Sequence, residues 1–332
     1  MPLGLTRAQI LAFRRRTGWL DERLPPGARS LRRAAWAGLQ DSMPRAALLS
    51  IHARVEGATP STWEHPSLVQ LWGPRFSVYV VAERDHAVFS LARLPDDERG
   101  RRVAEEMAAR LHALLGDRRL PDRELQEGVG NRIKYATATG TIRIRWEGAR
   151  APSVWIVPRP EIDPLDARLE LARRYLHVFG PATAAGFASW AGIAPAQAQG
   201  AFDRLARSLV AVRTPIGDAW ILARDEEAAR AAPAPAAPAR LLPSGDAYYL
   251  LQGADRELLV PSAEHRAMLW TSRVWPGAVL VEGEIAGTWR RAQAKLTIEP
   301  WRRLSRAERD AVEAEAAALP LQKPLPRRVR TG

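Results

Sequence analysis

Residues 165–223 read LDARLELARRYLHVFGPATAAGFASWAGIAPAQAQGAFDRLARSLVAVRTPIGDAWILA, and this stretch decides the fold. Its hydrophobic pattern has a helical period in three segments and then alternates in two short segments on either side of Gly217. The helical segments are 165–179, 183–192 and 195–209, and the alternating ones are 210–214 and 219–223. Three helices followed by a two-stranded wing predict a winged helix-turn-helix, in which the last helix usually enters the major groove of DNA.

The same order of elements recurs twice before this stretch. The first expected unit, 1–100, has helix patterns at 6–18, 30–39, 44–55 and 67–72, a strand pattern at 76–81 and a further helix from about residue 83. The second, 101–162, has helix patterns at 103–115, 121–130 and 132–139 and a hairpin pattern at 141–146 and 153–157. We therefore predict an α+β protein with about three tandem winged helix-turn-helix units, of which the third covers 163–230.

The composition changes after residue 230. Residues 231–240 (AAPAPAAPAR) are typical of an extended Pro/Ala linker. Short alternating segments then occur at 248–252, 257–260, 278–282, 284–289 and 295–299, before a charged helix pattern at 306–318. We expect a small β-rich module with a final helix at 241–320 and a basic tail at 321–332.

The charge of the chain indicates an anionic partner. The 332 residues include 49 Lys and Arg against 37 Asp and Glu, a net charge of +12. Only Lys134, Lys295 and Lys323 are lysines, so nearly all of the cations are arginines, whose planar fork suits phosphate groups and base edges. A GC-rich genome would also favour Arg over Lys, but it does not explain the surplus. The net charge predicts attraction to nucleic acid or to an anionic membrane surface.

Several classes of protein are excluded by what the sequence lacks. With no cysteine there is no disulfide, thiolate nucleophile or cysteine-ligated metal, and the six histidines show no metal-ligand spacing. We find no Gly-rich phosphate loop or nucleophile triad. No apolar run reaches the ~18 residues of a membrane span, and the N-terminus has no signal-peptide core. We expect a cytoplasmic, nucleoid-associated protein without metal or cofactor and without a membrane partner.

A set of short strings occurs in a fixed order along the chain. The strings are GLQ at 38–40, PRAALLS at 44–50, LWGPR at 71–75, RYL at 174–176, FGPAT at 179–183, FASW at 187–190, LLPSGD at 241–246, DR at 255–256 and GEIAGTWR at 283–290. In this order and spacing they resemble the AlkZ/YcaQ family of winged-helix DNA glycosylases. Together they cover most of residues 6–320. The resemblance implies a C-shaped array of three winged-helix units and a small β-barrel that wraps duplex DNA and excises alkylated purines or unhooks purine crosslinks.

The family places its catalytic side chains in a Gln-x-Gln or Gln-x-Asp motif. The corresponding triplet here is Gln40-Asp41-Ser42, which keeps the first Gln, has Ser at the third position and carries a carboxylate in the middle. A purine alkylated at N7 or N3 is already a good leaving group, so the protein must add a positioned water and a negative or dipolar group near the cation-like sugar. We expect Gln40 to position that water, with Asp41 or Ser42 assisting.

Structural roles compete with these catalytic ones. Ser42 precedes Pro44 by two residues and could cap the helix that begins there, and Asp41 would favour the same positive helix end. Gln40 could be an ordinary surface residue. Adjacent residues point to different faces, so Gln40 and Asp41 are not expected to point the same way.

The predicted partner is double-stranded, damaged DNA, bound by a monomer. Candidate contacts to the sugar-phosphate backbone are Arg32, Arg33, Arg75, Arg143, Arg145, Arg204, Arg207, Arg213 and Arg290. The main alternative function is a winged-helix DNA-binding protein without catalysis, either a regulator or a damage-recognition factor. A third possible function is an interaction scaffold whose winged helices bind protein. The sequence does not identify the DNA lesion.

Overall fold

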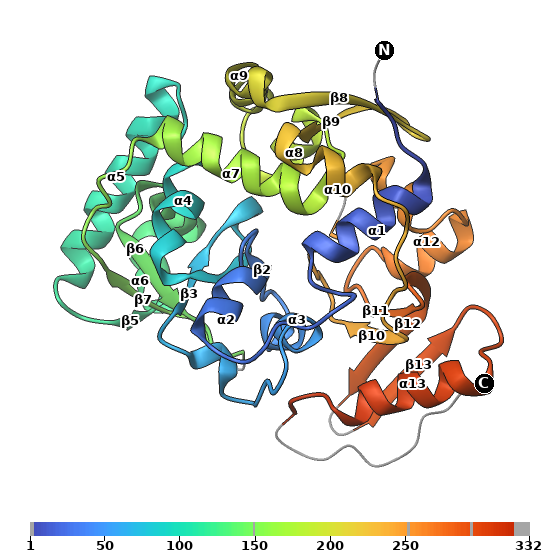
Figure 1. The fold of residues 1–332 in the computed structure, drawn as a ribbon. Helices are drawn as coiled ribbons and strands as arrows, with labels where there is room; N and C mark the ends of the chain where they lie inside the picture. The colour runs from blue at the N-terminus through green and yellow to red at the C-terminus, as the bar shows by residue number, and fades with distance from the viewer. Residues whose placement is uncertain (1–2, 149, 251–252, 293–294, 322–332) are drawn as a thin grey trace.

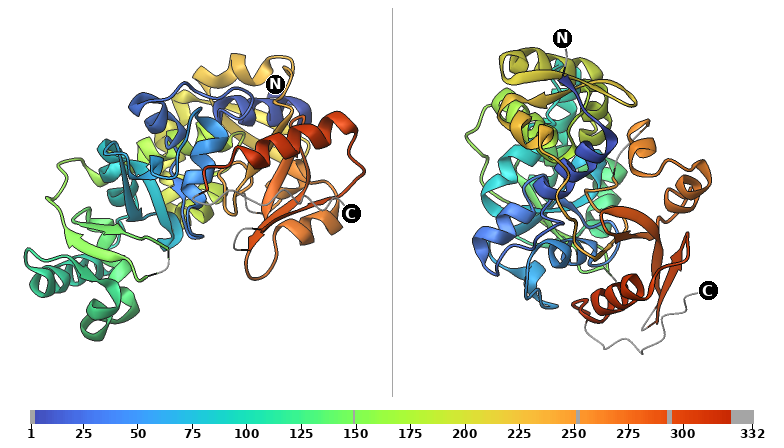
Figure 2. Two further views of the ribbon diagram at one scale, coloured as in Figure 1. Left: turned by 90° about the horizontal axis from the view of Figure 1, so that it is seen from below. Right: turned by 45° about the vertical axis from the view of Figure 1, so that its right-hand side comes forward.

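The computed structural model describes residues 3–148, 150–250, 253–292 and 295–321 and has an α+β fold (Figure 1). In Figures 1 and 2, a sheet formed before residue 160 and a second sheet formed after residue 238 lie on opposite sides of the molecule, and Figure 1 shows helices α7 (Pro164–Phe179) and α1 (Arg7–Thr17) above them. Among the described residues, no helix combines the length with the hydrophobicity that a membrane span requires.

The N-terminal part of the chain combines helices with a short sheet. Its further elements are α2 (Ala28–Ala34), β2 (Leu39–Gln40), α3 (Ala46–Arg54), η1 (Thr62–Glu64), β3 (Leu68–Trp72), η2 (Pro74–Phe76), β4 (Val78–Ala82), η3 (Glu83–Asp85) and α4 (His86–Leu91). The helix predicted at 67–72 is wrong, because this segment is β3, antiparallel to β4. Its residues are mostly buried on both faces, so the strand has no alternating pattern.

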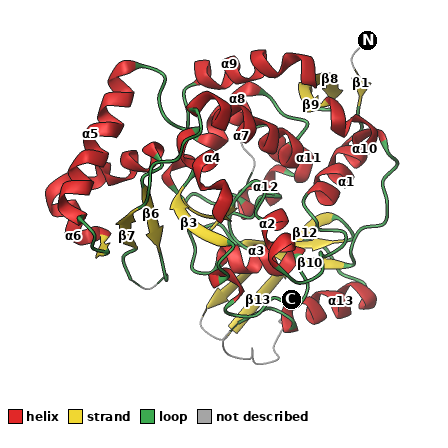
Figure 3. Ribbon diagram, turned by 60° about the vertical axis from the view of Figure 1, so that its left-hand side comes forward, coloured by secondary structure: helices red, strands yellow, loops and turns green. Residues whose placement is uncertain are grey.

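The next part of the chain extends the same sheet. It contains α5 (Glu98–Leu115), β5 (Leu120–Pro121), α6 (Asp122–Val129), η4 (Gly130–Thr139), β6 (Ile142–Arg145) and β7 (Ser153–Ile156). The strand order is β2-β4-β3-β6-β7-β5, and Gln70 of β3 pairs with Ile144 of β6. Figure 3 shows β6 and β7 beside β3. The segments expected to be the first and second units therefore share one six-stranded sheet.

The stretch that decided the predicted fold forms the expected elements. After α7 come α8 (Ala184–Ala191), α9 (Pro195–Leu205), η5 (Ala206–Ser208), β8 (Leu209–Thr214), β9 (Gly217–Leu222), η6 (Ala223–Asp225) and α10 (Glu226–Arg230). The N-terminal β1 (Leu3–Gly4) adds to this hairpin, parallel to β8. Tyr175, Phe179, Phe187 and Trp190 pack against one another with ring centroids 5.1 to 6.3 Å apart. These aromatic side chains hold α7 against α8.

The C-terminal module is an open sheet with helices. Its elements are β10 (Ala239–Leu242), α11 (Asp255–Leu259), α12 (Ala263–Leu269), β11 (Gly277–Val281), β12 (Glu284–Ala292), β13 (Lys295–Pro300) and α13 (Arg306–Ala317). The order is β10-β11-β12-β13, and among the described residues the outer strands β10 and β13 do not pair. The expected barrel-like closure is therefore wrong: four strands leave two edges, and α13 packs its Val312 and Ala316 against strand residues instead.

Two further expectations for this region also change. The strand predicted at 257–260 lies largely in helix α11, whose Glu and Leu residues favour a helix. Strand β10 begins at Ala239, so the last two residues of the expected linker belong to the sheet. The predicted basic tail lies outside the described residues from 322 onward.

One hydrophobic core connects the parts of the chain. Leu11 of α1, Tyr79 of β4, Tyr175 of α7 and Tyr249 after β10 belong to a single cluster of buried side chains. Because this core is shared, the N-terminal, central and C-terminal parts hold one another in place around the segment that contains Gln40.

Candidate active site and nucleic-acid interface

Gln40 lies at the end of the short strand β2, opposite Tyr79 of β4, and its side chain is half-buried. Its Oε1 accepts a hydrogen bond of 2.9 Å from Nη2 of Arg75. The other terminal nitrogen of Arg75 donates to the carbonyl of Trp190 in α8 at 2.7 Å. Arg75 therefore holds the Gln40 amide against α8, a helix that lies far from it in the sequence.

The amide nitrogen of Gln40 faces a turn from the C-terminal module. A Cβ atom added to Gly245 would lie 3.1 Å from Nε2 of Gln40, and Gly245 has a φ of +75°. Both the close approach and the left-handed backbone require glycine here. Within the described part of the chain Nε2 has no hydrogen-bond partner, so its N–H groups are available to a ligand.

Asp41 is sealed beneath the surface, with only 1% of the residue exposed. Its Oδ1 accepts from the backbone N–H of Ala47 at 3.0 Å, and its Oδ2 accepts from Nε2 of Gln70 at 2.8 Å. Gln70 in turn accepts from the N–H of Trp146 at 2.7 Å. The carboxylate thus stabilises the start of α3 and links it to the end of β6, in agreement with the structural role weighed for it.

Ser42 is exposed and does not cap α3. The helix begins at Ala46, and its N-cap position is taken by Arg45, which has a left-handed backbone and makes no side-chain cap bond. The capping role expected for Ser42 is therefore wrong, because the chain continues past it for three residues before the helix starts. The triplet places its three side chains differently: Gln40 half-buried, Asp41 enclosed and Ser42 open to solvent.

Burial raises the pKa of Asp41 to about 6, although the N–H of Ala47, the charge of Arg45 and the amide of Gln70 lower it in part. The Asp41 carboxyl has a pKa of ~3.9 in an unfolded chain. Between these two values the folded state binds more protons than the unfolded state, so the Asp41 contribution to stability falls as the pH rises from about 4 to about 6.

We expect Asp41→Asn to remove this pH dependence. Urea unfolding at about pH 4 and about pH 7 measures it: relative to the variant, the wild type should lose up to ~3 kcal/mol of unfolding free energy over that range. Taking the difference between the two proteins cancels the titration of all other groups. An equal pH dependence in both proteins would contradict a raised pKa at Asp41.

The predicted DNA contacts are spread over the molecule, and Arg75 alone among them bonds to Gln40 in the described structure. Arg143 and Arg145 share strand β6, but their guanidinium groups pair with Glu83 at 2.7 Å and Glu64 at 2.8 Å. The others lie on separate elements: Arg32 and Arg33 on α2, Arg204 on α9, Arg207 on η5, Arg213 on β8 and Arg290 on β12. Of these, Arg32 is partly buried and the rest are exposed.

The sequence analysis missed a stacked group beside the triplet. The guanidinium groups of Arg45 and Arg145 lie 3.7 and 3.8 Å from the ring centroid of Trp63, in η1. Arg45 also donates to the carbonyl of Glu147 at 3.1 Å. Stacking on an indole fixes each guanidinium plane. No periodic pattern connects these residues, so only their chemical type could have suggested the group.

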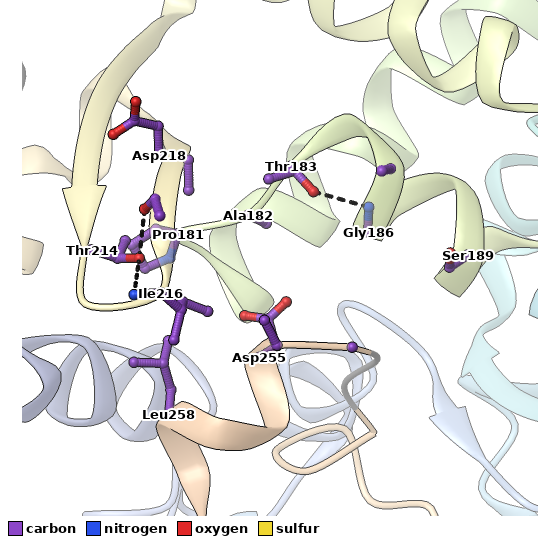
Figure 4. Close-up of a pocket in the computed structure, with 15 residues that line it drawn as sticks. Pro181, Ala182, Thr183, Gly186, Ser189, Thr214, Ile216, Asp218, Asp255 and Leu258 are labelled. Carbon is purple, nitrogen blue, oxygen red and sulfur yellow. Dashed lines mark hydrogen bonds between the residues drawn. The ribbon is translucent and has the colours of Figure 1, made fainter. Parts of the chain in front are cut away.

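A separate hollow of about 290 Å³ lies between α8, the β8–β9 turn and α11 (Figure 4). Thr183, Ser189, Asp218 and Asp255 are among the residues that line it, and no arginine does. Asp255 is paired with Arg14 at 2.9 Å. Two carboxylates and no lining cation make this hollow unsuitable for a nucleic-acid backbone, and Gln40 does not line it.

Comparisons with a family model, a curated relative and a solved structure all identify DNA glycosylases. The family model for DNA glycosylase AlkZ-like proteins matches residues 34–320. A relative from Streptomyces sahachiroi, named interstrand DNA cross-link repair glycosylase, is 29% identical over 159 residues, which are 47% of this chain and 42% of the relative. The solved structure of the Streptomyces sahachiroi DNA glycosylase AlkZ has the same fold, with a TM-score of 0.76, 21% identity, and coverage of 95% of this chain and 96% of that chain. Because the family model spans most of the sequence, the protein belongs to the AlkZ-like family of DNA glycosylases.

Proposed function

We propose that the protein is a monofunctional DNA glycosylase that hydrolyses the N-glycosidic bond of alkylated or bulky-adducted purines in duplex DNA, as the first step of base excision repair. The observation that carries the proposal is the Gln40 amide, whose oxygen accepts a hydrogen bond from Arg75 that holds the amide in one direction. A preoriented amide of this kind can hold a water molecule in a fixed direction.

The reaction needs little from the protein besides that water. As the N-glycosidic bond breaks, its electron pair goes to the alkylated purine, the water oxygen bonds to the sugar C1′, and a water proton passes to solvent. Oε1 of Gln40 has a second lone pair that accepts from the water and directs the water's oxygen toward C1′. Asp41 assists from beneath as a negative charge near the cation-like sugar, and the exposed Ser42 hydroxyl offers a further water contact.

The arrangement of the elements supports duplex binding. We interpret the helix groups and wings at 1–100, 101–162 and 163–230 as tandem winged-helix units that form a C-shaped array, completed by the module at 241–320. The exposed Arg204, Arg207 and Arg213 lie at the end of a helix and on a wing, where such units meet the sugar-phosphate backbone. The protein would act as a monomer, in the cytoplasm at the nucleoid, without metal or cofactor.

Base release tests this proposal directly. The purified protein is incubated with duplexes that carry N7-methylguanine, N3-methyladenine, a bulky N7 adduct or a purine interstrand crosslink, in the presence of EDTA. We expect abasic sites to form in at least one of these duplexes, because the positively charged purine leaves readily once the water is placed. Undamaged duplex is the control, and it should accumulate no abasic sites above the rate without protein.

Two features of the Gln40-Asp41-Ser42 triplet favour a second candidate function, that of a DNA-binding protein without catalysis. Its third position is Ser42, and its carboxylate is enclosed and bonded to Ala47 and Gln70. A DNA-binding protein without catalysis would tolerate both features. Tight, salt-dependent binding of all the duplexes with no abasic sites in any of them would replace the glycosylase proposal with this one.

A further inference from the structure

A second hollow, of about 630 Å³, lies beside the β6–β7 hairpin. We call it the arginine hollow. It is lined by Arg119, Pro121, Arg123, Arg145, Glu147, Arg150, Ala151 and Ser153. Four of these eight residues are arginines and one is an acid, so the lining carries a net positive charge.

The strand register explains why these side chains gather. Ser153 of β7 pairs with Pro121 of β5 on one side and with Arg145 of β6 on the other. Residues that pair across strands share a face of the sheet. The alternate residues Ile144 and Val154 are buried in the core behind the sheet. The same three strands therefore turn an apolar face inward and a polar, basic face outward.

Two of the four arginines that line the hollow are held in place by stacking on tryptophan rings. The guanidinium of Arg119 lies 4.1 Å from the ring centroid of Trp155, which fixes its plane. Arg145 stacks on Trp63 and pairs with Glu64. Among the side chains that the structure describes, Arg119 and Arg150 form no ion pair with a carboxylate. These two exposed guanidinium groups therefore remain available to an external anion.

The arginine hollow is joined to the triplet. Arg145 and Arg45 both stack on the ring of Trp63, and Arg45 donates to the carbonyl of Glu147 on the rim. Gln70 also connects the end of β6 to the triplet, because it accepts from the N–H of Trp146 and donates to Asp41. These contacts fix the distance between the hollow and the residue that follows Gln40, so an anion bound there has a constant position relative to Gln40.

We propose that the arginine hollow binds phosphodiester groups of the DNA strand next to the target nucleotide and sets the position of the duplex on the protein. Arginine forks in a concave surface match phosphate oxygens, and backbone contacts set the register of a protein on DNA without reading its sequence. The inference rests on the proposed function in taking duplex DNA as the ligand, but it concerns binding and not bond cleavage.

The test compares two double variants with the same change of charge. In R119Q/R123Q the hollow loses two arginines, whereas in the control R102Q/R110Q two exposed arginines of α5 that do not line it are replaced. The dissociation constant of an undamaged duplex is measured between about 50 and 200 mM salt. For the hollow variant we expect the slope of log K against log salt to fall by ~1.8 and binding at about 0.1 M salt to weaken ~60-fold, because each lost phosphate contact releases ~0.9 fewer counterions.

Three outcomes would overturn the inference. One is an equal loss in the two variants, which would indicate diffuse attraction. Another is an unchanged slope in R119Q/R123Q. The third is that R119Q/R123Q loses binding of inorganic pyrophosphate but not of duplex, which would make the hollow a site for a small free phosphate. Equal thermal unfolding midpoints for the three proteins are needed to attribute the change to binding.

Base release is scored separately, at protein concentrations that saturate the duplex. If the wild type releases no base, the glycosylase proposal fails while the salt slopes still test the hollow. If R119Q/R123Q keeps the wild-type slope while the wild type releases base, the arginine hollow fails and the glycosylase proposal stands.

Discussion

Gln40→Ala is expected to slow base release by about 100- to 1,000-fold, the usual effect of removing one preoriented polar group from a reacting centre. The amide of Gln40 is fixed by the 2.9 Å bond from Arg75, and an alanine offers no group in its place to hold the water. Single-turnover formation of abasic sites at saturating protein measures the rate. Duplex affinity, measured in parallel, should stay within about threefold, because the loss is confined to the reacting step.

A matched variant makes this result interpretable. Gln199→Ala removes the same amide from an exposed position of α9, where it bonds only to Asp203 among the described residues. We expect wild-type rates from it at saturating protein, where a change in duplex affinity through α9 does not enter the rate. Full activity in Gln40→Ala would contradict a catalytic role for Gln40. The water would then have to be held by other residues around the Gly245 turn.

Asp246→Ala is expected to lower the free energy of unfolding by about 3 to 5 kcal/mol. The carboxylate is completely buried, and it accepts from both terminal nitrogens of Arg54 at 2.7 Å and from the hydroxyl of Ser50 at 2.6 Å. Removing it leaves the Arg54 guanidinium, itself 3% exposed, without a counter-charge in the core. Urea unfolding at about pH 7 measures the change.

Two further variants distinguish the effect of the buried charge from the effect of removing any acidic side chain. Asp310→Ala removes an acid from the exposed pair with Arg306, at 4.0 Å, and should change stability by less than ~0.5 kcal/mol. The double variant R54M/D246L removes both charges and should recover part of the loss. A loss in Asp246→Ala no larger than that in Asp310→Ala would show that the buried pair does not hold the Gly245 turn in place.

Elements with a clear period were predictable from the sequence. The helix expected at 165–179 is found at Pro164–Phe179, and the two strands expected at 210–214 and 219–223 are found at Leu209–Thr214 and Gly217–Leu222. The segment 68–72 was not, because five mostly buried residues carry no period that separates a strand from a helix. The pairing of β3 with β6 was also not predictable, since sequence patterns do not say which strands pair over long separations.

The candidate site was predictable in part. The resemblance to known glycosylases located Gln40, and the rule that neighbouring residues point to different faces agrees with the enclosure of Asp41 behind it. The partners of the site come from distant segments: Arg75 holds Gln40 and reaches Trp190, and Gly245 closes the other side. The ion pairs of Arg143 and Arg145 with Glu83 and Glu64 were likewise invisible, because they connect residues 60 and 81 positions apart.

The six-stranded sheet limits how the protein can be divided into fragments. A truncation after residue 100 would remove β6 and leave the edge of β3 without a hydrogen-bonded partner strand. Exposed strand edges of this kind promote aggregation. A fragment that starts at residue 101 would expose the opposite side of the same break. The smallest fragment that preserves this sheet must run from β2 through β7. A deletion that ends at a boundary suggested by the sequence repeats would therefore lose activity because the fragment misfolds, and not because a functional residue is missing.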